Sequence, residues 1–149
     1  MSLGPASRRG LLAALVASPA LAEADLSLRA LVGGTLVSLG AHPAVSVLLR
    51  NVARGRQQQV YEGLRMPGPP LALVEDHWLV GWGRDGRRGL FMAFEMNQEQ
   101  LVLFLLDDGK PVYLSPRSSQ WPAPLAESFG EFSRGWLRAE APGLLKQDG

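Results

Sequence analysis

The chain has 149 residues, 46% of them hydrophobic and 19% charged, which is the size and composition of one globular domain rather than two. Basic and acidic side chains nearly cancel, 15 against 14, so no overall field attracts nucleic acid. The absence of cysteine excludes disulfides, thiolate metal sites and thiol nucleophiles, and leaves only His42 and His77 for imidazole chemistry. Composition therefore predicts a folded domain and excludes several chemistries without identifying a function.

The first 22 residues have the features of an export signal. The charged pair Arg8-Arg9 precedes an apolar run, Gly10 to Ala17, and small residues before Glu23 suit a signal peptidase. The run is shorter than the roughly 20 apolar residues of a spanning helix, and the paired arginines resemble the twin-arginine export pattern. We expect a signal peptide over residues 1–22 and a periplasmic location without stable membrane insertion. The alternative is an amphipathic N-terminal helix that stays in the fold.

The mature part, residues 23–149, is expected to be a single α+β domain. Its net charge is −1, from 13 basic and 14 acidic side chains, because the signal removes two arginines and no acid. In Asp25–Leu39 the apolar pattern is interrupted by Gly33-Gly34, which suggests a short helical turn and then an extended piece. An apolar stripe at helical spacing follows Pro43 and predicts a helix: Val45, Leu48, Leu49 and Val52.

A second helix is predicted over Gln57–Arg65, and the proline-rich run Met66–Pro70 ends it. Five apolar runs of strand length then follow: Leu71–Val74, Trp78–Trp82, Arg88–Glu95, Gln100–Leu106 and Pro111–Leu114. The turns between the later strands are expected at Asp85-Gly86, Asn97-Gln98 and Asp108-Gly109, and Asp-Gly favours tight antiparallel hairpins. Because the residues from Leu101 to Leu106 are apolar on both faces, we expect a central strand covered on both sides.

A last helical stripe closes the domain: Leu125, Phe129, Phe132 and Trp136. Together these patterns predict an antiparallel β-meander of about five strands with helices packed on one face.

Catalytic and metal-binding patterns are weak in this sequence. Glu75 and His77 would share one side of a strand, but two ligands make a poor metal site. His42 precedes a proline and is expected beside a helix start, and Asp107-Asp108 falls in a turn. Gly81-Trp82-Gly83 has no helix after it and so lacks the context of a phosphate loop. We expect no catalytic residue, metal or cofactor; an enzyme resting on His77 with Glu75 is a minor alternative.

The most distinctive stretch is the loop Gly83–Gly89, which carries three arginines, Arg84, Arg87 and Arg88, with Trp82 at its base and Asp85 at its turn. Arginine forks bind carboxylates or phosphates, so a rigid hairpin of this kind can enter an acidic cleft. The alternative is a solvated turn whose charge serves solubility. Nucleic acid is not expected as a partner, because few phosphate contacts are available.

Some of these segments resemble the Ivy-type inhibitors of vertebrate lysozyme. The residues that carry the resemblance lie between about 40 and 137: His42-Pro43-Ala44, Trp78-Leu79-Val80-Gly81, Leu90-Phe91-Met92-Ala93-Phe94, Asp108-Gly109 and Trp121-Pro122. The family fold is an antiparallel sheet with helices on one side. The chain departs from the family in the inhibitory loop, where Trp82 and Arg87 replace two cysteines and Asp85 replaces the histidine that reaches the lysozyme carboxylates.

The resemblance implies an exported, non-enzymatic inhibitor whose hairpin occupies the acidic cleft of a lysozyme-like glycosidase. The alternative is a divergent interaction or structural domain of the cell envelope that uses the same scaffold with a different partner. The oligomeric state stays open, a homodimer included.

Overall fold

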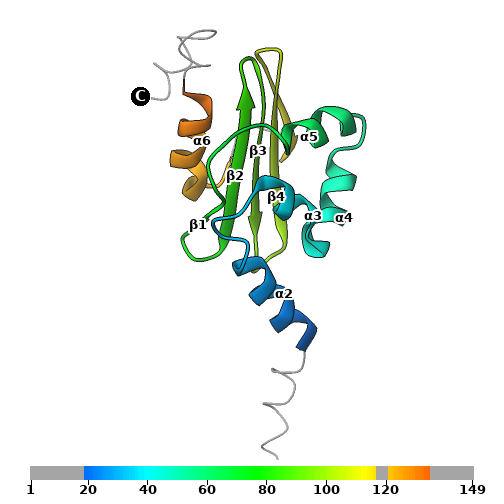
Figure 1. Cartoon of the computed structure of the whole chain (residues 1–149), viewed down its shortest axis with the longest axis vertical. Helices are drawn as coiled ribbons and strands as arrows, with labels where there is room; N and C mark the ends of the chain where they lie inside the picture. The colour runs from blue at the N-terminus through cyan, green and yellow to red at the C-terminus, as the bar shows by residue number, and fades with distance from the viewer. Residues whose placement is uncertain (1–18, 117–120, 135–149) are drawn as a thin grey trace, which may run out of the picture.

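The computed structural model describes residues 19–116 and 121–134, and the chain forms helices first, then a sheet, then a helix (Figure 1). The N-terminal helices are α2 (Pro19–Arg29), α3 (Leu36–Ala41), α4 (Pro43–Val52) and α5 (Gln57–Gly63). The strands are β1 (Ala72–Val74), β2 (Trp78–Asp85), β3 (Arg88–Glu95), β4 (Gln100–Asp107) and β5 (Lys110–Ser115). A 3-10 turn, η1 (Ala123–Leu125), leads into α6 (Ala126–Ser133).

The five strands pair antiparallel in chain order, which confirms the predicted meander and the α+β fold. At the β4–β5 turn, Asp108 and Gly109 both have positive φ, 53° and 83°, as tight hairpins require. In the β2–β3 hairpin Gly86 has φ 64°, and the ladder continues to the pair Asp85–Arg88. The predicted loop Gly83–Gly89 is therefore shorter than expected, because β2 extends three residues beyond Trp82.

The segment after β1 differs from the sequence prediction. Glu75 and Asp76 have positive φ, 51° and 65°, and form a turn with His77 between β1 and β2. Alternation along a strand does not apply in such a turn, so the expectation that Glu75 and His77 share one strand face is wrong.

Helix α4 confirms its apolar stripe, with Val45 and Leu49 buried and Pro43 in the first turn. The expected extended piece before it is instead helix α3. Gly33 has φ 88° and turns the chain, and Thr35 then caps α3, since its Oγ1 accepts a hydrogen bond from Ser38 N at 3.2 Å. A Gly-Gly pair thus marks a turn between two helices here rather than the start of a strand.

Helices cover both faces of the sheet. The sequence prediction had placed all of them on one face. Helices α2 to α5 cover one face, on which the buried side chains are aliphatic apart from Phe94. Helix α6 covers the other face, where Phe91, Phe104 and Phe132 lie in the core (Figure 1). All residues of Leu101–Leu106 are at most 4% exposed, which confirms the strand covered on both sides.

The predicted signal peptide and the predicted C-terminal helix lie partly outside the described residues. Residues 1–18 of the expected signal peptide are outside them, and α2 runs continuously through the expected cleavage point before Glu23. Beyond that point, Leu28 of α2 is buried in the core. In the C-terminal stripe, Leu125 and Phe132 are buried and Phe129 is half-buried, whereas Trp136 lies outside the described residues.

Candidate functional site

The candidate binding residues predicted from the sequence lie in the hairpin between β2 and β3, and their side chains point in different directions. Trp82 is half-buried and packs edge-on against Phe132 of α6, with ring centroids 5.7 Å apart. Asp85 is exposed at the end of β2. The tryptophan therefore anchors the base of the hairpin, as expected, and only the tip faces solvent.

Arg84 links the hairpin to the end of α6. Its Nη1 donates to the carbonyl oxygens of Phe132 and Arg134, both at 3.0 Å, and its Nη2 donates to the Gly86 carbonyl at 2.8 Å. Burial lowers the pKa of this guanidinium from its ordinary value. A cation that hydrogen-bonds the last carbonyls of a helix stabilises the helix end, so Arg84 serves the fold and not a partner.

Arg87 and Arg88 are the arginines that reach the surface. Arg87 donates through Nε to Asp108 Oδ1 at 3.1 Å and through Nη2 to the Asp108 carbonyl at 2.9 Å. Arg88 forms an ion pair with Glu62 of α5, and hydrogen bonds from Gln58 and Arg88 lower the pKa of that carboxyl. Both side chains stay about half exposed, 56% for Arg87 and 49% for Arg88. Their guanidinium groups are therefore held in place at the surface.

Two further cations reach the same end of the sheet, and the sequence analysis did not include them. In a meander, alternate turns lie at one end, so Lys110 and the Asp107-Asp108 turn sit beside the β2–β3 tip. Arg56 joins them through an ion pair with Asp107 Oδ2 at 2.8 Å. The order of the strands could have predicted that Lys110 lies at this end of the sheet. Arg56 lies between α4 and α5, and no local sequence pattern indicates that it reaches Asp107. We call this region the basic end and define it as Arg56, Arg87, Arg88 and Lys110.

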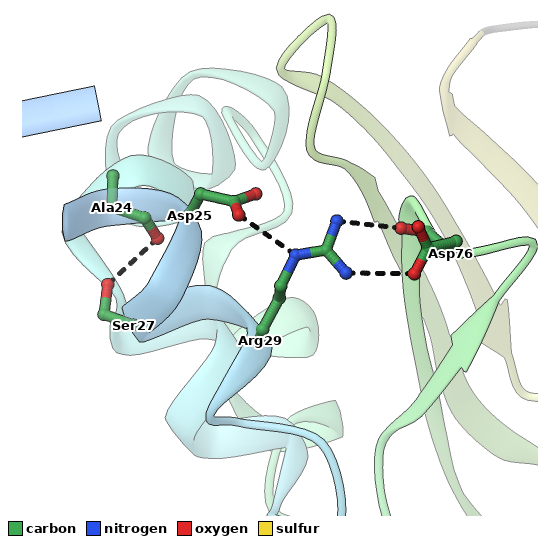
Figure 2. A network of polar contacts seen from close by, with 5 residues as sticks. All are labelled: Ala24, Asp25, Ser27, Arg29 and Asp76. Carbon is green, nitrogen blue, oxygen red and sulfur yellow. Dashed lines mark hydrogen bonds and ion pairs between the residues drawn. The ribbon is translucent and has the colours of Figure 1, made fainter. Parts of the chain in front are cut away.

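The opposite end of the sheet is acidic. Arg29 of α2 binds Asp25 Oδ2 through Nε at 3.0 Å, and it binds Asp76 at the side chain and at the carbonyl, both at 3.1 Å (Figure 2). These contacts raise the pKa of Arg29, chiefly through the hydrogen bond to Asp25. His77 Nδ1 lies 2.8 Å from the buried carboxylate of Glu95. The histidine thus pairs with Glu95 and not with Glu75, the partner considered from the sequence.

Ser27 and His42 form a contact that resembles part of a hydrolase triad, with Ser27 Oγ 2.7 Å from His42 Nε2. The other ring nitrogen, Nδ1, accepts a hydrogen bond from Ala44 N at 3.0 Å. In the neutral ring Nε2 therefore carries the proton and donates to Ser27 Oγ, which in turn donates to the Ala24 carbonyl. A general base needs its acceptor nitrogen toward the serine, so this geometry serves helix capping and not catalysis.

The other residues considered for catalysis or ligand binding also have structural roles. Asp107 and Asp108 bind Arg56 and Arg87, and the glycines at 81 and 83 lie within β2. Over residues 19–116 and 121–134 no group of three His, Cys, Asp or Glu side chains could hold a metal ion. The same ranges contain no helix of the length and hydropathy needed to cross a membrane.

No protein-family model, curated protein or solved structure matches this chain. The resemblance to Ivy-type inhibitors stays a prediction that depends on the motifs given above.

Proposed function

We propose that the chain is an exported, non-enzymatic binding protein that uses its basic end to contact an acidic partner, and that this partner is a lysozyme-like glycosidase. The observation that carries the proposal is the fixed, half-exposed placement of Arg87 and Arg88 at the tip of a rigid hairpin. The tip is also tied to the next hairpin, because Gly109 N donates to the Arg87 carbonyl at 2.7 Å. A pre-organised tip loses little conformational entropy on binding.

The ion pairs at the tip are compatible with binding. Asp108 is 80% exposed and Glu62 is 42% exposed, so both pairs lie in high dielectric. Exposed ion pairs contribute only about 0–1 kcal/mol each, so carboxylates of a partner can replace them at little cost. Glycosidase clefts contain two carboxyl groups that arginine side chains could neutralise.

The length of the hairpin favours a second candidate, the envelope interaction domain without lysozyme inhibition. Only Gly86 and Arg87 lie beyond the last cross-strand pair. A turn of two residues suits a shallow acidic surface better than a deep cleft. The two candidates share the basic end and differ in the partner.

Inhibition of cell-wall lysis tests the proposal. Purified chain should slow lysis by a lysozyme, and Arg87→Glu combined with Lys110→Glu should relieve that inhibition by at least tenfold in concentration. Arg50→Glu on the exposed side of α4 is a control for a charge reversal elsewhere on the surface, because it lies outside the basic end. If micromolar chain leaves lysozymes and transglycosylases unaffected, the glycosidase proposal is wrong. Capture of an acidic envelope protein by the original chain and not by the Arg87/Lys110 variant would then support the second candidate.

A further inference from the structure

A groove beside α3 is not used by the proposed function and consists of two adjoining hollows. The larger hollow, of about 500 Å³, lies between the segments 33–37 and 64–70 and reaches Trp82. The smaller, of about 150 Å³, is lined by Val37, Gly40, Ala41, Tyr61, Leu64 and Arg65. Val37, Leu64 and Arg65 line both hollows, so the two are continuous. The larger one falls within the roughly 300–1,000 Å³ of small-molecule sites.

Backbone contacts fix both walls of this groove. On one side, Gly33 N donates to the Leu71 carbonyl at 2.8 Å and Leu71 N donates to the Gly34 carbonyl at 3.0 Å. On the other side, the Pro67 carbonyl accepts from Arg84 N at 2.9 Å. Gly68 lies so close to the Trp82 carbonyl that a Cβ there would collide with it. The groove is therefore formed before any ligand arrives.

The smaller hollow has an apolar lining, whereas the larger hollow has about as much polar as apolar surface. Three wall residues are prolines, at 67, 69 and 70, and they have no amide hydrogen to donate. Val37 is 43% exposed although it stands between the two hollows, and the smaller hollow is lined mainly by apolar atoms. The smaller hollow therefore suits an apolar chain better than a sugar or a nucleotide, because those ligands need many paired polar groups.

One charge stands at the junction of the hollows. Among the described residues that line the groove, Arg65 is the single ionisable cation, and no acidic side chain accompanies it. A guanidinium group makes strong bidentate hydrogen bonds to a carboxylate. The ligand that complements this arrangement has one anionic head and one apolar chain.

We infer that the groove binds a medium-chain fatty acid, with the carboxylate at Arg65 and the acyl chain in the hollow beside Gly40 and Tyr61. Gly40 lets Leu64 pack closely against α3, since a Cβ there would lie 3.0 Å from a methyl of Leu64, and this contact fixes the wall of the smaller hollow. The inference goes beyond the proposed function, because it uses Arg65 and Val37 and none of the basic end. The two ideas can therefore fail separately.

Calorimetric titration of the full chain with dodecanoate, below its micelle concentration, tests the inference. We expect one binding site and at least tenfold weaker binding of dodecyltrimethylammonium, which has the same chain and the opposite charge. Arg65→Gln should weaken dodecanoate binding about tenfold, as expected for one charge-assisted contact. Arg50→Gln, an exposed arginine on α4, should change it less than twofold.

The apolar part of the site has its own matched pair of variants. Val37→Gln should weaken dodecanoate binding severalfold, whereas Val47→Gln, at a similarly exposed valine of α4, should leave it unchanged. Saturation shifts of the Gly33, Gly34 and Gly40 amide signals would place the ligand in the groove, and unchanged signals elsewhere would show that each variant is folded. Equal binding of dodecanoate and dodecyltrimethylammonium would overturn the inference. Equal effects of Arg65→Gln and Arg50→Gln on dodecanoate binding would overturn it as well.

Discussion

The two faces of the sheet are covered by different means, although the same strands supply both. On the face under α2 to α5, aliphatic side chains from four helices meet leucines of the strands, and contacts spread over a wide area. On the face under α6, rings gather around Phe91 and Phe104, and the helix has eight residues. The first face distributes its stability among many small contributions. The second concentrates it in a few large side chains, so single substitutions there should have larger effects.

Neighbouring residues of β4 allow the two faces to be compared directly. Phe104 points to the aromatic face, where its ring lies 5.1 Å from Tyr113 and from Phe129, and Leu103 points to the aliphatic face. Both are fully buried. Phe104→Ala should lower the free energy of unfolding by about 3–5 kcal/mol, and Leu103→Ala by about 2–4 kcal/mol.

Chemical denaturation measures both losses, and near-ultraviolet circular dichroism separates the faces. The aromatic signal should collapse in Phe104→Ala and persist in Leu103→Ala at temperatures where both are folded. Equal loss of that signal in the two variants would contradict the division of the core into an aliphatic and an aromatic face.

The attachment of α6 gives the next largest effect. Arg84→Met keeps the aliphatic part of the side chain and removes the donors that bind the Phe132 and Arg134 carbonyls. We expect a loss of about 1–3 kcal/mol, because these hydrogen bonds involve a charged donor at a helix end. Hydrogen exchange should show faster opening of α6 and unchanged protection in α4. Arg87→Met, at the exposed tip, serves as control and should cost less than 1 kcal/mol.

Substitution of two helical glycines should change the free energy of unfolding by smaller amounts and in opposite directions. In α5, a Cβ on Gly63 would lie 2.6 Å from Leu90 Cβ, so Gly63→Ala must push α5 away from the sheet and should cost about 1–3 kcal/mol. In α6, nothing lies within 4 Å of a Cβ on Gly130, so Gly130→Ala should add about 0.5–1 kcal/mol. Thermal unfolding measures both. Stabilisation by Gly63→Ala would show that α5 is less closely packed than the structure indicates.

Local signals explain which parts of the fold the sequence could predict. Alternating apolar residues and Asp-Gly pairs act over a few positions, and they predicted four of the strands closely and the two tight hairpins. The stripe beginning at Val45 predicted α4 for the same reason. Turn chemistry without glycine was missed, because Glu75 and Asp76 adopt positive φ only where tertiary contacts favour it.

The candidate site could not be predicted to the same extent, since its geometry depends on distant pairs. Arg84 binds a carbonyl 48 residues away, Arg87 a carboxylate 21 residues away and Arg88 a carboxylate 26 residues away. Three arginines that lie within five residues of sequence therefore contact three different parts of the fold. Sequence could identify the hairpin, but only the fold distinguishes Arg84, which holds α6, from Arg87 and Arg88, which reach solvent.

The smallest expected effect is a pH dependence confined to the face under α2 to α5. His42 caps α4 through its unprotonated Nδ1, which accepts from Ala44 N, and burial lowers the pKa of the ring below its ordinary value of 6.5. The unfolded chain therefore binds a proton at a higher pH than the folded chain does. The stabilisation is complete above about pH 6.5 and is lost as the pH falls through the folded pKa.

Amide exchange in α4 should accordingly accelerate between neutral pH and about pH 5, after correction for the intrinsic rate, while exchange in α6, on the opposite face of the sheet, stays constant. His42→Asn keeps a capping acceptor that does not titrate in this range, so it should remove the pH step and retain most of the stability. His42→Ala should remove both, at a cost of about 0.5–2 kcal/mol. A pH step that persists in His42→Asn would show that the His42 cap is not the pH-sensitive element.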